Sequence, residues 1–281
     1  MPELPEVETV MRGLSPVLSG NKIVKIDLHR PNLRIPFPKD MQKQLSNKKI
    51  ISLQRRAKYI FILLEGGQIL VIHLGMSGRI LIIPHGEEYE LQKHDHMVVT
   101  MKTGEKIIYN DPRRFGMVFI IDEDELETHK IFSRLGPEPL SNNFSAAYLL
   151  ETLKSKNTSI KQALLDQHVV VGVGNIYACE ALYQSKINPM AKASSIKGKK
   201  AENLVRAIRD VLTRAIKAGG STLKDYRHAD GELGYFQHSF TVYDQEGETC
   251  PDCDCNIAKT GGVKRIVQSG RSTFYCPRQQ K

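Results

Sequence analysis

The spacing of apolar residues divides the chain into a strand-rich first half and a helical second half. Between about residues 22 and 122, Ile, Val, Leu and aromatic residues crowd short segments separated by turn signals such as Glu65-Gly66-Gly67. The predicted strands are Lys22–Leu28, Ile50–Leu64, Gln68–Pro84, His96–Met101 and Lys106–Ile121. This pattern is typical of antiparallel hairpins and predicts a β-sandwich.

One amphipathic helix is expected ahead of these strands. The i, i+3, i+4, i+7 spacing of one apolar face is carried by Val7, Val10, Met11 and Leu14. Pro5 suits the first helical position, where its missing N–H costs nothing. A buried helix that starts three residues after Pro2 would fix a terminus of a kind that is usually poorly ordered.

The second half has a helical period. Residues 134–145 combine Gly, two prolines and polar residues and predict a linker. Asn143 or Ser145 can cap a helix that runs to about Ser155, and a second helix follows Thr158. A third helix starts near Asn175. The fourth has an apolar face that runs from Leu204 to Ile216, and it stops at Gly219-Gly220.

Composition narrows the class of protein. The 281 residues carry a net charge of +9, which suits a polyanionic partner such as nucleic acid. No apolar run reaches membrane-spanning length and no signal peptide precedes the first helix, so we expect no membrane association and a cytoplasmic location. Nothing in the sequence indicates a stable oligomer, and we expect a monomer.

The start of the chain carries candidate chemistry. Loss of Met1 would leave Pro2 with a free secondary amine, a nucleophile that can form a cationic Schiff base with a sugar aldehyde. A terminal amine titrates near pH ~8, so part of it is unprotonated at neutral pH. Glu3 is a carboxylate placed to move protons. On these residues alone, the alternative is that Pro2 merely follows the initiator.

Motifs along the whole chain resemble the formamidopyrimidine-DNA glycosylase family. They run in order from the second residue to the last ten. They are Pro-Glu-Leu-Pro-Glu-Val-Glu-Thr at 2–9, Arg-Arg-Ala-Lys-Tyr at 55–59, His-Leu-Gly-Met-Ser-Gly at 73–78, Asp-Pro-Arg-Arg-Phe-Gly at 111–116, Leu-Gly-Pro-Glu-Pro-Leu at 135–140, Val-Gly-Val-Gly-Asn-Ile-Tyr at 171–177 and Gly-Arg-Ser-Thr-Phe-Tyr-Cys at 270–276.

The resemblance implies an α+β fold and a base-excision-repair enzyme acting on damaged double-stranded DNA. The implied domains are an N-terminal catalytic β-sandwich domain at 1–133, a linker at 134–145, a helix-two-turn-helix DNA-binding domain at 146–235 and a zinc-finger-like hairpin at 236–281. The family is bacterial, removes oxidised purines such as 8-oxoguanine and formamidopyrimidines, and then cuts the abasic strand by β,δ-elimination. A cytoplasmic enzyme of this kind would associate with the nucleoid while it repairs DNA.

The resemblance also implies the catalytic residues. Pro2 is the nucleophile that attacks C1′ of an everted nucleotide, and Glu3 is its acid–base partner. Lys58 contacts a phosphate beside the lesion and assists elimination. From the residues alone, Lys58 reads as a solvated charge within an edge strand. Arg271 clamps the phosphate of the damaged nucleotide with its bidentate guanidinium.

The remaining implied residues contact DNA. His94, Arg113, Lys156 and Asn175 match positions that contact the DNA backbone, although His94 could also belong to a polar turn or a stray metal site. Met76, Arg113 and Phe115 match the trio that fills the space left by an everted base. A lone Met or Phe in a β-rich segment is otherwise most often core.

A glycine-bearing loop at about 220–238 matches the segment that covers the everted base. Gly219, Gly220, Asp230, Gly231 and Gly234 indicate its flexibility, and its candidate neighbours of that base are Ser221, Thr222 and Tyr235.

The cysteine pattern departs from the family. Cys250, Cys253, Cys255 and Cys276 lie in the last 32 residues, and Gln279 stands where the fourth family cysteine is expected. Cys255 could substitute as the fourth ligand of one Zn²⁺, although it lies only two residues from Cys253. The alternative is a weak or empty site with the hairpin held by packing. If the missing ligand loosens the hairpin, Gln279→Cys should restore lesion binding.

Two other functions remain open on the sequence. The chain could be a glycosylase for oxidised pyrimidines, similar to endonuclease VIII, with the same terminal proline. It could also be a non-catalytic DNA-binding relative with a decayed finger. The Met76, Arg113 and Phe115 trio disfavours the first, and intact Pro2, Glu3 and Lys58 disfavour the second.

Overall fold

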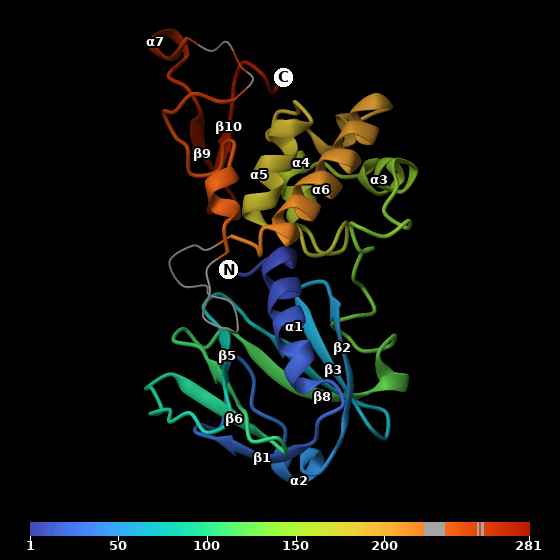
Figure 1. The fold of residues 1–281 in the computed structure, drawn as a ribbon. Coiled ribbons are helices and arrows are strands. Elements are labelled where there is room, and N and C mark those ends of the chain that lie inside the picture. The colour runs from blue at the N-terminus through green and yellow to red at the C-terminus, as the bar shows by residue number, and fades with distance from the viewer. Residues whose placement is uncertain (222–233, 252, 254–255) are drawn as a thin grey trace. The chain divides into compact units, whose positions relative to one another are not determined.

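The computed structural model describes residues 1–221, 234–251, 253 and 256–281 (Figure 1). The fold has two compact units. The first comprises Met1–Ser133 with Ala218–Tyr235, and the second comprises Arg134–Lys217 with Phe236–Lys281. The sequence-based division places 218–235 with the helical domain. In the structure this segment belongs to the first unit, where Ser221 is hydrogen-bonded to Glu6.

The described strands of the first unit form two antiparallel four-stranded sheets, with strand orders β1-β6-β7-β5 and β2-β3-β4-β8. One sheet comprises β1 (Ile23–Leu28), β5 (Arg79–Ile83), β6 (Asp95–Met101) and β7 (Lys106–Asn110). The other comprises β2 (Ile50–Arg56), β3 (Tyr59–Leu64), β4 (Gln68–His73) and β8 (Met117–Asp122). Apolar residues of both sheets share one core, as in a sandwich.

Helix α1 (Leu4–Leu18) packs its apolar face into this core. Val7, Val10 and Leu14 are buried there, as predicted, and Met11 is partly buried against them. The helix begins one residue earlier than expected, with Glu3 as N-cap and Pro5 at the second helical position. Two short helices, α2 (Met41–Leu45) and η1 (Glu123–Glu125), complete the described elements of this unit before Ser133.

Three predicted strands are each two strands joined by a turn. Ile50–Leu64 breaks at Ala57-Lys58, 68–84 breaks at 74–78, and 106–121 breaks at 111–116. The Ala57-Lys58 break lacks the Gly, Asn and Asp that mark ordinary turns, so β-propensity carried the prediction through it. The other two breaks do carry turn residues, Gly75 and Gly78 in the first and Asp111-Pro112 and Gly116 in the second, but their apolar flanks outweighed these signals in the prediction. The last two turns carry candidate DNA-contacting residues.

The second unit is built from helices with an appended hairpin. Its longer helices are α3 (Ala146–Leu153), α4 (Ile160–Leu165), α5 (Asn175–Gln184) and α6 (Lys199–Lys217). Ser145 caps α3 by accepting a hydrogen bond from the Tyr148 amide, and Ser159 caps α4 in the same way through Gln162. The remaining described elements are η2 (Ala193–Ser195), η3 (Phe236–Ser239), α7 (Ile257–Thr260), β9 (Lys264–Gln268) and β10 (Arg271–Tyr275).

A buried carboxylate ties α5 to the segment that leads into the hairpin. Glu180 is 2% exposed, and its two oxygens accept hydrogen bonds from the amides of Thr241, Val242 and Tyr243 at 2.8–2.9 Å. Apolar residues of α5 and β10, including Cys179, Tyr183 and Phe274, pack in the same cluster as the cysteines. The mixed helix and sheet composition confirms the α+β fold class. None of the described helices is long and apolar enough to cross a bilayer.

Candidate functional site

Pro2 and Glu3 are buried and directly precede the first residue of α1. Figure 1 marks this end of the chain with N. Glu3 is only 2% exposed. Its amide donates to Glu6 Oε2 at 2.8 Å, and its carbonyl accepts the first helical hydrogen bond from Val7 at 3.1 Å. The helix therefore holds Glu3, and Pro2 next to it, in one backbone conformation. A free terminal amine at Pro2 would lie beside a carboxylate in a largely desolvated setting.

Glu6 also holds the first residues of the glycine-bearing loop. Its Oε1 accepts hydrogen bonds from the Ser221 amide at 2.8 Å and from Ser221 Oγ at 3.0 Å. Gly220 has φ +76° and would bring a Cβ within 3.0 Å of the same oxygen, so glycine suits this approach. Sequence reasoning missed Glu6, although a Glu three residues after Glu3 is the spacing of a capping box.

The described residues of the loop are its two ends. Tyr235 pairs with Ser221 in an isolated β-bridge, and its side chain is 61% exposed. Gly234 lies so close to the Gly219 and Gly220 carbonyls that a Cβ would clash with them. Thr222, Asp230 and Gly231, also named as loop residues on the sequence, lie outside the described residues.

Lys58 is placed differently from the prediction. It lies in the two-residue turn between β2 and β3, where Arg56 pairs with Tyr59. Ala57 turns the chain with a left-handed φ of 55° and is itself buried. Lys58 is 7% exposed, so the interpretation as a solvated charge within an edge strand is wrong. A buried cation is costly, and such a residue has a defined role in most proteins.

His73, which sequence reasoning did not single out, lies within the field of Lys58. Burial, followed by the positive charges of Lys58 and Arg34, lowers the pKa of His73 to about 4. Its Nδ1 accepts the Gly75 amide at 3.1 Å, so the neutral ring presents Nε2–H as a donor. Its ring lies 4.7 Å from that of Tyr59. The sequence did offer a signal for His73, because it is the first residue of the His-Leu-Gly-Met-Ser-Gly motif at 73–78.

The structure brings Met76, Arg113 and Phe115 onto two turns that pack together. A Cβ on Gly75 would lie 2.4 Å from the Phe115 backbone, so only glycine permits this approach. Met76 and Phe115 are 37% and 45% exposed, although both are large and apolar. The Arg113 guanidinium lies 5.0 Å from the centre of the Phe115 ring. Such exposure does not fit the alternative of core residues.

A buried carboxylate fixes both turns. Asp111 is fully buried; its Oδ1 accepts from Ser77 Oγ at 2.6 Å and its Oδ2 from the Gly116 amide at 2.9 Å. Ser77 Oγ in turn accepts the Arg113 amide at 3.1 Å. His94 joins this group, because its carbonyl accepts the Asp111 amide at 3.0 Å. The backbone around the trio and His94 is thus held by one network of hydrogen bonds centred on Asp111.

In the second unit, Lys156 and Asn175 lie beside helix starts. Lys156 precedes α4, and its Nζ lies 2.9 Å from Asp166 Oδ2. Partial burial is the largest single influence and raises the pKa of Asp166, but the hydrogen bonds and positive charges of Lys156 and His168 together outweigh it, and the pKa is lowered. Asn175 is the first residue of α5 and donates from Nδ2 to the Ser272 carbonyl at 2.9 Å.

Arg271 lies directly after the hairpin turn. Ser269 and Gly270 both have positive φ, 48° and 73°, as two-residue hairpin loops require, and Arg271 pairs with Gln268 across the turn. The Arg271 side chain is exposed. The tip therefore presents a guanidinium to solvent on a short, well-defined loop.

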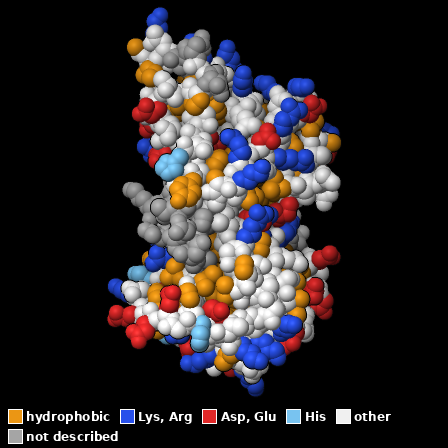
Figure 2. Space-filling view, in the orientation of Figure 1, with side chains coloured by type: hydrophobic (Ala, Val, Ile, Leu, Met, Phe, Trp, Pro, Cys, Tyr) orange, Lys and Arg blue, Asp and Glu red, His pale blue; other side chains and the backbone are white. Residues whose placement is uncertain are grey.

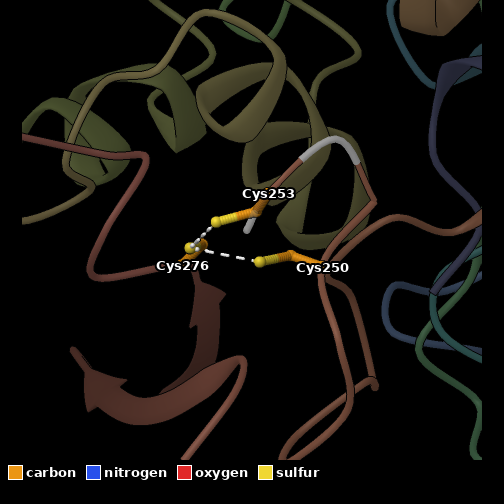
Figure 3. Close-up of side chains that lie close together, drawn as sticks. All are labelled: Cys250, Cys253 and Cys276. Carbon is orange, nitrogen blue, oxygen red and sulfur yellow. Dashed lines mark hydrogen bonds between the residues drawn. The ribbon is translucent and has the colours of Figure 1, made fainter. Parts of the chain in front are cut away.

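Three cysteines meet next to the end of β10, where Cys276 follows the strand (Figure 3). Cys276 Sγ lies 3.2 Å from Cys250 Sγ and 3.7 Å from Cys253 Sγ. Thiolates on a tetrahedral zinc are about 3.7 Å apart for Zn–S bonds of about 2.3 Å, so these residues fit three corners of such a site. The Gln279 amide donates to Cys276 Sγ at 3.4 Å. Cys255 lies outside the described residues.

Positive charge gathers on the second unit. Figure 2 shows Lys and Arg side chains over α6 on the face in view, and the exposed ones of this helix are Lys199, Lys200, Arg206, Arg214 and Lys217. A surface of this kind attracts polyanions over distances comparable to a Debye length.

Two family profiles match the chain. The formamidopyrimidine-DNA glycosylase N-terminal domain matches residues 1–118, and the formamidopyrimidine-DNA glycosylase H2TH domain matches residues 135–227. The chain is 51% identical to the formamidopyrimidine-DNA glycosylase of Roseobacter denitrificans and 49% identical to that of Rhodospirillum rubrum. Each alignment covers the whole of both chains.

Solved structures match over the full length as well. The MutM (Fpg) protein from Thermus thermophilus gives a TM-score of 0.87 at 37% identity, covering 99% of this chain and 98% of that one. A Lactococcus lactis Fpg variant in complex with DNA containing Fapy-dG gives 0.90 at 32% identity, with complete coverage of both. The chain belongs to the formamidopyrimidine-DNA glycosylase family.

Proposed function

We propose that this chain is a bifunctional DNA glycosylase and abasic-site lyase that excises oxidised purines from double-stranded DNA through Pro2. Family membership over its full length supports the activity, as does the Lactococcus lactis relative whose structure contains Fapy-dG DNA. The observation that carries the proposal is Pro2, which would become terminal on loss of Met1, beside a buried carboxylate and held by a helix start.

The reaction proceeds in two stages. The neutral Pro2 nitrogen attacks C1′ of an everted nucleotide, the glycosidic bond breaks, and the base leaves with its bonding electrons and takes up a proton. Glu3 protonates the sugar ring oxygen as the ring opens, which yields a cationic iminium. That cation acidifies the C2′ proton. Loss of this proton with the 3′ phosphate, followed by loss of the 5′ phosphate, leaves a one-nucleotide gap. Water then hydrolyses the remaining iminium, which releases the sugar fragment as an unsaturated aldehyde and restores the Pro2 amine.

Two cations serve the phosphates in this proposal. Lys58 acts in the first unit, and Arg271 acts from the hairpin tip of the second. His94, Lys156 and Asn175 extend the backbone contacts.

Met76, Arg113 and Phe115 act as the wedge. The exposed apolar side chains of Met76 and Phe115 can enter the space left by the everted nucleotide. Arg113, whose backbone is held by Ser77, can hydrogen-bond the orphaned partner base. Ser221 and Tyr235 lie at the ends of the loop that covers the base. The substrate is chromosomal DNA, so we place the enzyme in the cytoplasm, at the nucleoid during repair, as a monomer.

One zinc ion per chain is part of the proposal. Cys250, Cys253 and Cys276 would supply three thiolate ligands, and Cys255 would supply the fourth in place of the family cysteine at the position of Gln279. The ion has a structural role and contributes folding free energy to the segment behind the hairpin.

Parallel incision assays test the function. Duplexes that contain 8-oxoguanine, formamidopyrimidine or thymine glycol are incubated with the purified enzyme under single-turnover conditions. We expect rapid incision of both purine lesions and a one-nucleotide gap. Preferential incision of thymine glycol would favour the pyrimidine-specific alternative, and binding without incision would favour the non-catalytic one.

A further inference from the structure

A lysine that the proposed chemistry does not use is buried in the second unit. Lys161, the second residue of α4, is 1% exposed. Its Nζ donates to the Ser272 carbonyl at 2.9 Å and to Thr273 Oγ1 at 2.7 Å. These two acceptors belong to β10. Burying an ammonium group is costly, and Met would fill a similar volume without that cost, so the charge indicates a role beyond packing.

Lys161 belongs to a set of contacts that hold both sides of the hairpin turn. The Ser272 carbonyl receives a second hydrogen bond, from Asn175 Nδ2 at 2.9 Å, so residues of two helices fix one backbone oxygen. On the other side of the turn, Gln268 Nε2 donates to Ser159 Oγ at 3.2 Å. Gln162, next to Lys161, is hydrogen-bonded to Ser269 in the turn itself.

The cysteines act at the opposite end of β10. Arg271 begins the strand and Cys276 follows its last residue. A strand advances about 3.3 Å per residue, so about 17 Å separates these two positions. A metal bound at Cys276 fixes the far end of the strand. The backbone next to Arg271 is fixed by the amino group of Lys161.

We propose that Lys161 is a positioning residue for Arg271, and that it keeps the hairpin tip in place whether or not metal is bound at the cysteines. The inference rests on the proposed function, in which Arg271 binds the phosphate of the damaged nucleotide. The anchor accounts for how a chain with Gln279 at a family ligand position keeps an ordered tip.

Hydrogen exchange in the full-length protein tests the anchor directly. In Lys161→Met, the amides of residues 271–274 should exchange about 10- to 100-fold faster, the effect of losing hydrogen bonds to a charged group. Lys200→Met, an exposed lysine on α6, is the matched control and should exchange like the wild type. Thr273→Val removes one acceptor without removing the lysine, and should give a smaller increase even if Lys161→Met folds poorly.

Removal of metal is the second arm of the exchange experiment. Chelation should leave exchange at 271–274 in the wild type unchanged. Two results would overturn the proposal. In the first, the amides of residues 271–274 exchange at the wild-type rate in both Lys161→Met and Thr273→Val. In the second, chelation speeds their exchange in the wild type as much as Lys161→Met does.

A catalytic readout separates positioning from loss of folded enzyme. Borohydride trapping on a duplex with a preformed abasic site counts active molecules. In the active molecules, Lys161→Met should raise KM about tenfold and shift products from β,δ- toward β-elimination, and Arg271→Ala should do the same. The double variant should be no worse than Arg271→Ala alone, because the two act through one contact.

The same assay distinguishes the two possible failures. A wild-type enzyme that neither traps nor incises would refute the proposed function, whereas the exchange result would still decide the anchor. A wild type that traps, together with a Lys161→Met variant of unchanged KM and product ratio, would refute the positioning role.

Discussion

At the residue scale, the chemistry depends on groups whose setting differs from their sequence appearance. Lys58 follows two arginines and resembles a surface charge, yet its side chain is buried in a turn. Met76 and Phe115 resemble core residues, yet both are exposed. Burying the charge of Lys58 and exposing the apolar side chains of Met76 and Phe115 are both unfavourable for stability. Such exceptions are expected at functional sites.

Phe115→Ala tests the wedge. Removing the ring should lower the rate of 8-oxoguanine excision at least about tenfold, because base eversion loses the side chain that occupies the vacated stack. Cleavage of a preformed abasic site, which needs no base to be everted, should fall much less. The comparison is of single-turnover rates on the two duplexes, with the exposed Leu140→Ala as control. Equal losses on both would count against the wedge.

The lowered pKa of His73 predicts how the stability of the protein depends on pH. Its folded-state pKa of about 4 lies below the unfolded value of about 6.5, so the unfolded chain binds more protons between these limits. The free energy of unfolding contributed by His73 is therefore complete above about pH 6.5 and falls by up to about 3 kcal/mol as the pH drops to about 4.

Urea unfolding at several pH values measures this effect. His73→Asn keeps an acceptor for the Gly75 amide but does not titrate, so its stability should fall less than that of the wild type between pH 6.5 and 4. His29→Asn, at an exposed histidine, serves as control and should follow the wild type. Parallel curves for wild type and His73→Asn would show that His73 is not held neutral.

At the element scale, the sequence specified the regular elements well because local signals sufficed. Ser145, one of the two predicted candidates, caps α3, and α4 follows Thr158 as predicted, with Ser159 as its cap. The apolar spacing of Val7, Val10 and Leu14 marked the buried face of α1. Turns without Gly-rich signals, such as Ala57-Lys58, were missed because a left-handed alanine has no local signature.

Contacts distant in sequence could not be predicted from local patterns. Glu6 contacts Ser221, and Lys161 contacts Ser272, across separations of more than a hundred residues. The sequence pattern around Glu6 or Lys161 does not predict which distant residue each will contact. The resemblance to a family supplied candidate roles, but it did not show that Lys161 and Asn175 share one acceptor.

The cysteine-bearing segment gives a prediction at this scale. If Cys255 is the fourth ligand, Cys255→Ser should weaken zinc binding on the order of 100-fold, because one ligand of four carries about a quarter of the roughly 10–16 kcal/mol of a structural site. Gln279→Cys should change little alone but should restore affinity in the Cys255→Ser background. Competition with a chromogenic chelator measures the affinities.

Two outcomes would contradict that ligand set. Unchanged zinc affinity in Cys255→Ser would remove Cys255 from the site. A large gain from Gln279→Cys in the otherwise unmodified chain would show that the fourth position had been vacant.

At the scale of the whole molecule, the proposed functions are shared between the two units. The first unit carries Pro2, Glu3 and the Met76, Arg113 and Phe115 trio, for which we propose the roles of nucleophile, acid–base partner and wedge, and the second carries Arg271, Lys156 and Asn175, the proposed phosphate contacts. Family profiles match both units, and relatives align over the complete chain. The net charge of +9 serves both, because a duplex offers phosphates along its whole length.

Everything in this account depends on the covalent bond between Pro2 and the sugar. The most direct measurement is borohydride reduction of the enzyme on an 8-oxoguanine duplex, followed by proteolysis and mass spectrometry of the cross-linked peptide. We expect a mature chain without Met1 whose DNA adduct lies on the Pro2 nitrogen, and little adduct in Pro2→Gly. An adduct on a lysine, or full activity in a chain that retains Met1, would contradict the mechanism.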